Sequence, residues 1–167
     1  MTTTRPLNVL FLCTHNSARS ILAEALLNHM GEGRFRGFSA GSSPRENQRP
    51  NPLGLQALQE AGVSVEGLSS KSWDAFAGPD APHMDLIITV CDNAAGEVCP
   101  YWPGHPATAH WGYSDPSAGD APDAVKLAAF RQTLLAIQQR LRLLLSLSPE
   151  QLAAAQLETT ARSLANA

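Results

Sequence analysis

One cysteine and one arginine near the N-terminus have the types and the spacing to bind and attack an oxyanion. Cys13 and Arg19 stand at the two ends of the segment Cys-Thr-His-Asn-Ser-Ala-Arg. A loop that leads into a helix directs backbone N–H groups and the positive end of the helix dipole toward one point, which binds tetrahedral anions. Arginine adds a planar charge that pairs with two oxygens at once. The segment therefore predicts an oxyanion site formed by Thr14, His15, Asn16, Ser17, Ala18 and Arg19.

The same surroundings favour a reactive form of Cys13. A thiol beside a helix N-terminus and an arginine has a lowered pKa and is then a thiolate at neutral pH. Ser20 follows the arginine and is placed to donate a hydrogen bond to the sulfur, while Asn16 tolerates the left-handed backbone that such loops need. The alternative is a buried cysteine at a strand end with an unrelated surface arginine. The buried strand before the loop and the helix after it favour the interpretation of Cys13 as a nucleophile.

Two further cysteines, Cys91 and Cys99, flank a short loop in the second half of the chain. Three cysteines are an odd number, which argues against a framework of structural disulfides. A structural zinc site needs four ligands, and the sequence has no second cysteine pair and no close pair of histidines to supply the other two. The positions of the three cysteines therefore indicate a chemical rather than a structural role.

Hydrophobic periodicity and turn residues divide the chain into alternating strands and helices. Continuous or short apolar runs predict strands at residues 7–13, 37–40, 85–91 and 108–111. Helical spacing predicts helices at residues 20–30, 52–62 and 123–147, the second of them capped by Asn51. A Ser-Pro pair at 148–149 then begins another, Ala-rich helix.

This alternation predicts an α/β fold with a four-stranded parallel sheet flanked by helices and with ligands at the carboxyl ends of the strands. Cys13 and Cys91 end two of these strands, so the two thiols are expected at one edge of the sheet. We expect one catalytic domain at residues 1–147 and a helical extension at residues 148–167. The extension offers little apolar surface, and we expect its removal to leave activity intact.

Composition excludes several classes of partner. The formal net charge is −3, and no run of Lys or Arg could neutralise several phosphates of a nucleic acid. The longest apolar run near the N-terminus is shorter than the core of a secretory leader, and no stretch reaches the thickness of a bilayer. The sequence therefore predicts a cytoplasmic protein without nucleic-acid or membrane partners.

The Cys-x5-Arg-Ser loop after the first strand resembles that of the low-molecular-weight protein tyrosine phosphatase family. In that family an Asp-Pro pair late in the chain supplies a general acid, and Asp115 and Pro116 match it. Such an acid is needed because the oxygen that leaves a pentavalent centre must be protonated. Alone, the Asp-Pro pair would only indicate a turn. The resemblance implies the fold of that family and a catalytic role for Asp115.

Within this family the chain is similar to the arsenate reductases. The Cys91 to Cys99 loop and the His-Trp-Gly at 110–112 match them, and residues 117–120 lack the aromatic side chains that phosphatases place there. The resemblance implies that Cys13 attacks arsenate, that Asp115 protonates the departing oxygen, and that Cys91 and then Cys99 take over the disulfide. Thioredoxin is the implied reductant, and glutathione with glutaredoxin, or mycothiol, stays open.

The resemblance implies no tightly bound cofactor, but some relatives hold a structural potassium ion near the loop. Asn16, Glu24, Ser39 and Asp74 match those positions, although Glu24 could equally be an exposed helix carboxylate. Two alternative functions remain at this point. One is a low-molecular-weight tyrosine phosphatase, and the other is a non-catalytic protein that binds oxyanions or senses redox state.

Overall fold

The computed structural model describes residues 6–31, 33–42, 44, 46–76, 80–90, 107–147, 161 and 164. The predicted loop with Cys91 and Cys99 lies outside the described residues, as does most of the predicted C-terminal helix. No helix within the described ranges is long and apolar enough to cross a bilayer.

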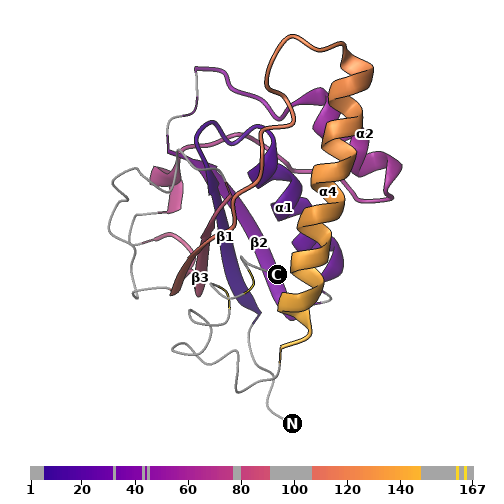
Figure 1. The fold of residues 1–167 in the computed structure, drawn as a ribbon. Coiled ribbons are helices and arrows are strands. Elements are labelled where there is room, and N and C mark those ends of the chain that lie inside the picture. The colour runs from indigo at the N-terminus through magenta and orange to yellow at the C-terminus, as the bar shows by residue number, and fades with distance from the viewer. Residues whose placement is uncertain are drawn as a thin grey trace.

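Four parallel strands form the sheet, in the spatial order β2-β1-β3-β4 (Figure 1). The central strand β1 is buried along most of its length, as its continuous apolar sequence indicates. The predicted four-stranded parallel sheet is confirmed. Its strands are β1 (Leu7–Cys13), β2 (Phe35–Gly41), β3 (Leu86–Thr89) and β4 (Ala107–His110).

Helices cover one face of the sheet, and a short 3-10 helix lies on the other (Figure 1). Successive side chains of a strand point to opposite faces. Phe11 and Cys13 accordingly belong to the core under the helices, whereas Leu10 and Leu12 belong to a smaller core against the 3-10 helix. Burial on both faces explains why the strand sequence does not alternate. These elements are α1 (Arg19–Met30), α2 (Pro52–Glu60), α4 (Asp123–Leu145) and η1 (Trp73–Phe76).

Several boundaries differ from the predicted ones. Strand β2 begins at Phe35 rather than at 37, because its pairing with β1 starts at Leu7 opposite Phe35. Helix α2 has the predicted cap, since the Asn51 side chain accepts a hydrogen bond from the Leu53 backbone N–H. It ends at Glu60, before Gly62 takes a φ of 79°. The sequence analysis did not predict η1.

Two residues of the C-terminal extension are described, and both are helical. Ala161 is fully buried in the larger core, and Leu164 packs against that core. The extension therefore contributes to the core of the catalytic domain. This differs from the expectation that it adds little core surface, because that expectation considered only the composition of the extension and not what it covers.

Candidate oxyanion-binding site

The junction between β1 and α1 positions the predicted nucleophile and its arginine. Cys13 is the last residue of β1 and is only 5% exposed, and Arg19 is the first residue of α1. A cavity of about 110 Å³ lies at this junction and is of a size for a small anion. Its walls combine residues of the loop with two residues that follow β4. They are Cys13, Thr14, His15, Ser17, Ala18, Arg19, Asp115 and Ser117.

The loop lies directly against Gly41 at the end of β2. Gly41 is paired with Cys13 in the sheet, and a side chain at this position would come within 2.6 Å of the Thr14 carbonyl oxygen. Only glycine fits without a shift of the loop backbone. The sequence analysis missed Gly41, because nothing in its local sequence indicates which segment will pack against it.

Asn16 is the one predicted anion-binding residue that does not line the cavity. It is fully buried and has a φ of 55°, the left-handed conformation expected for the loop. Its side-chain N–H donates to the Ser20 hydroxyl oxygen at 2.8 Å, and its side-chain oxygen accepts from the Lys71 backbone N–H at 2.9 Å. Asn16 thus stabilises the loop through contacts on the side away from the cavity. A hydrogen bond from Ser20 to the Cys13 sulfur stays a prediction.

Arg19 crosses from α1 to the segment after β4. Its Nη1 donates to the Tyr113 carbonyl oxygen at 2.7 Å, and its Nη2 lies 4.0 Å from Oδ2 of Asp115. Its buried Nε has no hydrogen-bond partner within the part of the chain that the structure describes. A buried donor of this kind needs an acceptor, which a bound oxyanion would supply.

Asp115 lies at the mouth of the same cavity. Its Oδ1 accepts hydrogen bonds from the backbone N–H of Ser117 at 2.9 Å and from the Ser117 hydroxyl at 2.7 Å. Its side chain is 40% exposed, and its Oδ2 is the oxygen that faces Arg19. Ser117 therefore fixes the carboxyl group in place at the cavity.

Val90 follows the end of β3 and directly precedes Cys91 in the sequence. Val90 donates its backbone N–H to the Leu12 carbonyl oxygen at 2.9 Å, and its own carbonyl accepts from Tyr113 at 3.3 Å. The residue before Cys91 is thus hydrogen-bonded to the residue before Cys13. The positions of Cys91 and Cys99 themselves lie outside the described residues.

Three of the four residues that match a potassium site gather around Lys71, which the sequence analysis did not single out. Asn16, Glu24 and Ser39 all contact it, whereas Asp74 is exposed on η1. Glu24 is not an exposed helix carboxylate, since its side chain is only 14% exposed.

Burial shifts the titration of both charged groups in this cluster. It raises the pKa of the Glu24 carboxyl, an effect that the Ser39 hydrogen bond and the Lys71 charge partly offset. It lowers the pKa of the Lys71 ammonium, which the charge of Glu24 partly offsets. The Glu24 charge thus offsets part of the desolvation of Lys71, whereas for Glu24 the Ser39 hydrogen bond offsets more than the Lys71 charge does.

Comparisons with known proteins place this site in a family. The family model described as low molecular weight phosphotyrosine protein phosphatase matches residues 8–159. An arsenate reductase of Bacillus licheniformis is 35% identical over 136 residues, which cover 80% of this chain and 91% of that protein.

Solved structures agree with this placement. An arsenate reductase in the phosphate-binding state superposes with a TM-score of 0.66 at 26% identity and covers 84% of this chain and 97% of its own. A thioredoxin-dependent arsenate reductase of Corynebacterium glutamicum superposes with a TM-score of 0.55 at 26% identity and covers 85% of this chain and 65% of its own.

Proposed function

Because this chain belongs to the low molecular weight phosphotyrosine protein phosphatase family, we propose that it is an arsenate reductase that converts arsenate to arsenite. The observation that carries the proposal is the match over most of both chains to a relative named arsenate reductase. The geometry supports it, since a thiol, a guanidinium and a carboxyl group line one small cavity. Arsenate is a tetrahedral oxyanion of the kind that a helix N-terminus and an arginine bind.

In the first step the Cys13 thiolate attacks the arsenic atom of the bound anion. Arg19 and the N-terminus of α1 stabilise the negative charge of the oxygens. Asp115 donates a proton to a hydroxyl group of arsenate, which leaves as water, and a bond between Cys13 sulfur and arsenic remains. At this stage no electrons have moved to arsenic from a second thiol, so the product is still an arsenic(V) adduct.

In the second step a relay through the other two cysteines transfers two electrons. The Cys91 thiolate attacks the Cys13 sulfur, the sulfur–arsenic bond breaks with its electron pair on arsenic, and arsenite leaves. Cys99 then attacks Cys91, which frees Cys13 as a thiolate and leaves a Cys91–Cys99 disulfide. The hydrogen bond from Val90 to Leu12 supports the first exchange, because it holds the chain before Cys91 beside the chain before Cys13.

Reduction of the final disulfide requires an external dithiol, and we propose thioredoxin. The support is a structural relative from Corynebacterium glutamicum that is named a thioredoxin-dependent arsenate reductase. Each turnover would oxidise one thioredoxin dithiol to its disulfide and return Cys91 and Cys99 to thiols.

The cavity argues against an aryl phosphate as the main substrate. Among the described residues that line it, only His15 is aromatic, so the cavity offers a phenyl ring no stacking surface other than this imidazole. A purely oxyanion-binding or redox-sensing role would leave the carboxyl group at the cavity mouth without a purpose. No specific observation favours either alternative.

A coupled assay tests the proposed function. Arsenate, thioredoxin, thioredoxin reductase and NADPH are mixed with the protein, and NADPH oxidation is followed together with arsenite formation. We expect one arsenite for each NADPH. A parallel assay with p-nitrophenyl phosphate should show only slow hydrolysis. Faster turnover of the aryl phosphate than of arsenate would contradict the proposal.

A further inference from the structure

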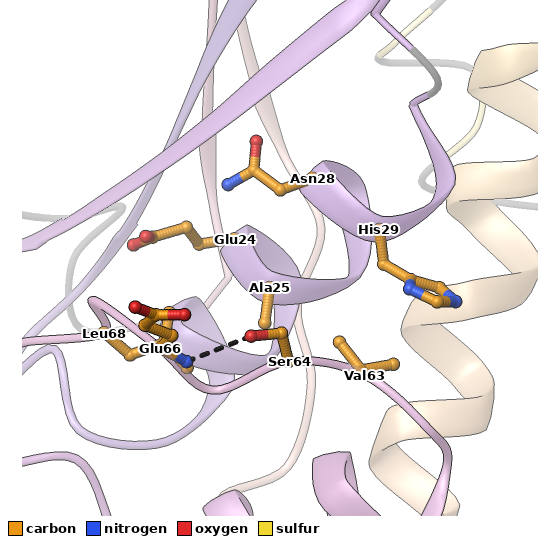
Figure 2. A pocket seen from close by; sticks show the side chains of 8 residues that line it. All are labelled: Glu24, Ala25, Asn28, His29, Val63, Ser64, Glu66 and Leu68. Atoms are coloured by element: carbon orange, nitrogen blue, oxygen red, sulfur yellow. Dashed lines mark hydrogen bonds between the residues drawn. The ribbon is translucent and has the colours of Figure 1, made fainter.

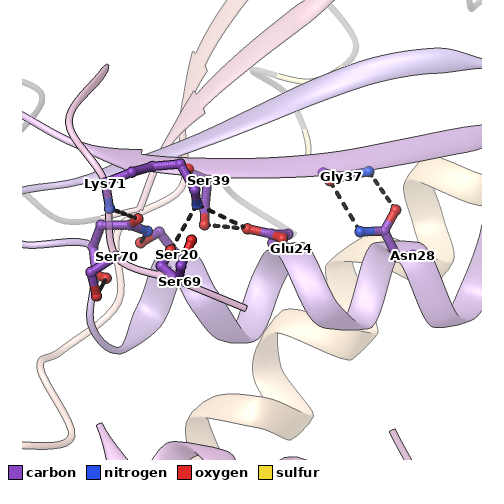
Figure 3. A network of polar contacts seen from close by, with 9 residues as sticks. Ser20, Glu24, Asn28, Gly37, Ser39, Ser69, Ser70 and Lys71 are labelled. Carbon is purple, nitrogen blue, oxygen red and sulfur yellow. Dashed lines mark hydrogen bonds and ion pairs between the residues drawn. The ribbon is translucent and has the colours of Figure 1, made fainter. Parts of the chain in front are cut away.

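Three oxygen atoms from three different segments face the ammonium group of Lys71 (Figure 3). Its Nζ donates hydrogen bonds to the carbonyl oxygens of Ser69 at 2.7 Å and of Ser39 at 3.0 Å, and it lies 3.9 Å from Oε1 of Glu24. Glu24 also accepts a hydrogen bond from the Ser39 hydroxyl. One positive charge therefore joins α1, β2 and the segment before η1.

The segment that carries this charge also holds the oxyanion-binding loop. The Lys71 backbone N–H donates to the Asn16 side chain at 2.9 Å, and the Ser70 hydroxyl donates to the Asn16 carbonyl oxygen at 2.5 Å. The Lys71 carbonyl in turn accepts from the Gly41 N–H at 2.8 Å. The left-handed conformation of Asn16 thus depends on a backbone segment that the ammonium anchors.

The residues that match a potassium site do not fit an added potassium ion. The Asn16 side-chain oxygen already accepts a hydrogen bond from the Lys71 backbone, and the Ser39 and Glu24 oxygens face its ammonium. Asp74, the fourth match, is exposed on η1. A metal cation at these oxygens would lie against the ammonium, and the two like charges would repel each other.

We propose that Lys71 is a positioning residue whose ammonium is a built-in cation that takes the place of a metal ion and keeps the oxyanion-binding loop in its anion-binding conformation. A lysine ammonium carries one positive charge and donates hydrogen bonds to oxygens, so it matches the oxygens that a monovalent cation would bind. The proposal concerns anion binding, and it holds or fails independently of whether arsenate is reduced.

One member of the cluster, Glu24, faces a cavity. Glu24 lines a cavity of about 430 Å³ between α1 and residues 63–68, together with Asn28, Ser64 and Glu66 (Figure 2). Loss of the ammonium would leave the Glu24 carboxylate, which this cavity makes accessible, beside two carbonyl oxygens that have lost their donor. A variant without the ammonium should therefore acquire a dependence on potassium.

The test compares Lys71→Met with Lys126→Met, a change of the other lysine in the chain. The dissociation constant for arsenate, by calorimetry, and the melting temperature are measured in potassium, sodium and choline chloride at equal ionic strength. Wild type and Lys126→Met should be the same in all three salts. In choline chloride Lys71→Met should bind arsenate about tenfold more weakly, the scale seen when a group that orients a binding site is lost.

Potassium chloride should restore both the arsenate affinity and the melting temperature of Lys71→Met. Adding Glu24→Gln to that variant should abolish the restoration, because the carboxylate that attracts the ion is gone. Lys71→Arg keeps the charge and should bind arsenate better than Lys71→Met in choline chloride.

Several results would overturn the proposal. One is a selective response of the wild type to potassium, which requires no variant to observe. Another is an arsenate affinity of Lys71→Met in choline chloride equal to that of wild type. A loss of affinity that no cation restores, or an equal loss in Lys71→Arg and Lys71→Met, would show that the charge is not what positions the loop.

Discussion

Trp111 donates its indole N–H to the carbonyl oxygen of Ala161 at 2.8 Å, across 50 positions of sequence, and both residues are fully buried. Trp111 directly follows β4, four positions before Asp115. The C-terminal extension is thereby joined to the strand end that leads to the candidate general acid. A contact of this kind makes the extension part of the folded domain.

We therefore expect that deletion of residues 149–167 destabilises the protein. It uncovers Trp111 and removes Ala161 and Leu164 from the core, so the free energy of unfolding should fall by more than about 2 kcal/mol, as in large-to-small core substitutions. Urea denaturation measures this. A chain that ends at residue 164 is the control and should keep its stability. An unchanged midpoint for the longer deletion would contradict the prediction.

Trp111→Phe removes the hydrogen bond to Ala161 and keeps an aromatic side chain in the core. A smaller aromatic ring remains, but the buried Ala161 carbonyl loses its donor and the missing part of the indole leaves a cavity, so the free energy of unfolding should fall by at least about 1–3 kcal/mol. The measurement is again urea denaturation. A loss smaller than the error of the extrapolation would mean that the contact is not formed in solution.

Cys13→Ser should abolish arsenate reduction and keep arsenate binding. The nucleophile is lost, whereas Arg19 and the loop remain in place around the cavity. Calorimetry of arsenate binding and the coupled assay separate the two effects. A variant that still reduces arsenate at a tenth of the wild-type rate would exclude Cys13 as the nucleophile.

Asp115→Asn should slow the chemical step without loosening arsenate binding. Loss of a general acid typically costs about 10²–10⁴ in rate. Asp120→Asn changes an exposed carboxylate of the same loop and should leave the rate unchanged. Equal rates for Asp115→Asn and wild type would remove Asp115 from the mechanism.

The order of the thiols can be read from trapped disulfides. After one equivalent of arsenate, Cys99→Ser should release arsenite and hold a Cys13–Cys91 disulfide, because nothing downstream is needed to form that bond. Cys91→Ser should release none. Peptide mapping by mass spectrometry identifies the pairs. A Cys13–Cys99 pair would reverse the assigned roles, and a glutathione adduct on Cys13 would point to a small-thiol reductant.

The charge of Lys71 should also be visible in the titration of Glu24. Burial raises the pKa of this carboxyl, and the nearby ammonium lowers it in part. Lys71→Met should therefore raise the pKa of Glu24 further, and Lys126→Met should leave it unchanged. Carbon-detected NMR of the side-chain carboxyl across a pH series measures both.

The raised pKa of Glu24 also determines how the free energy of unfolding changes with pH. Because the pKa of Glu24 is higher in the folded state than in the unfolded chain, its contribution becomes less favourable as pH rises from the ordinary glutamate value through the folded pKa. In Lys71→Met that decline should extend to higher pH. A stability profile parallel to that of wild type would contradict it.

The sequence by itself determined the parts of the molecule that lie within one continuous segment. A buried strand, a polar loop and a helix follow one another between Leu7 and Met30, so the apolar run, the turn and the helical periodicity located Cys13 and Arg19 without knowledge of the rest. The same local rules predicted the four parallel strands, since a parallel strand buried on both faces has a continuous apolar sequence. The ends of the elements were less exact, because pairing partners decide them.

Only the tertiary structure decided which distant residues complete the site. The Arg19 side chain donates to a carbonyl 94 positions away, and the loop rests on Gly41. Lys71 stands in a Ser-Ser-Lys-Ser run that is typical of an exposed loop, yet its side chain is only 28% exposed and its ammonium contacts Glu24 and Ser39. Local sequence sets the backbone propensities of a segment, but burial and the pairing of its charges depend on what other segments cover, and packing alone settles that.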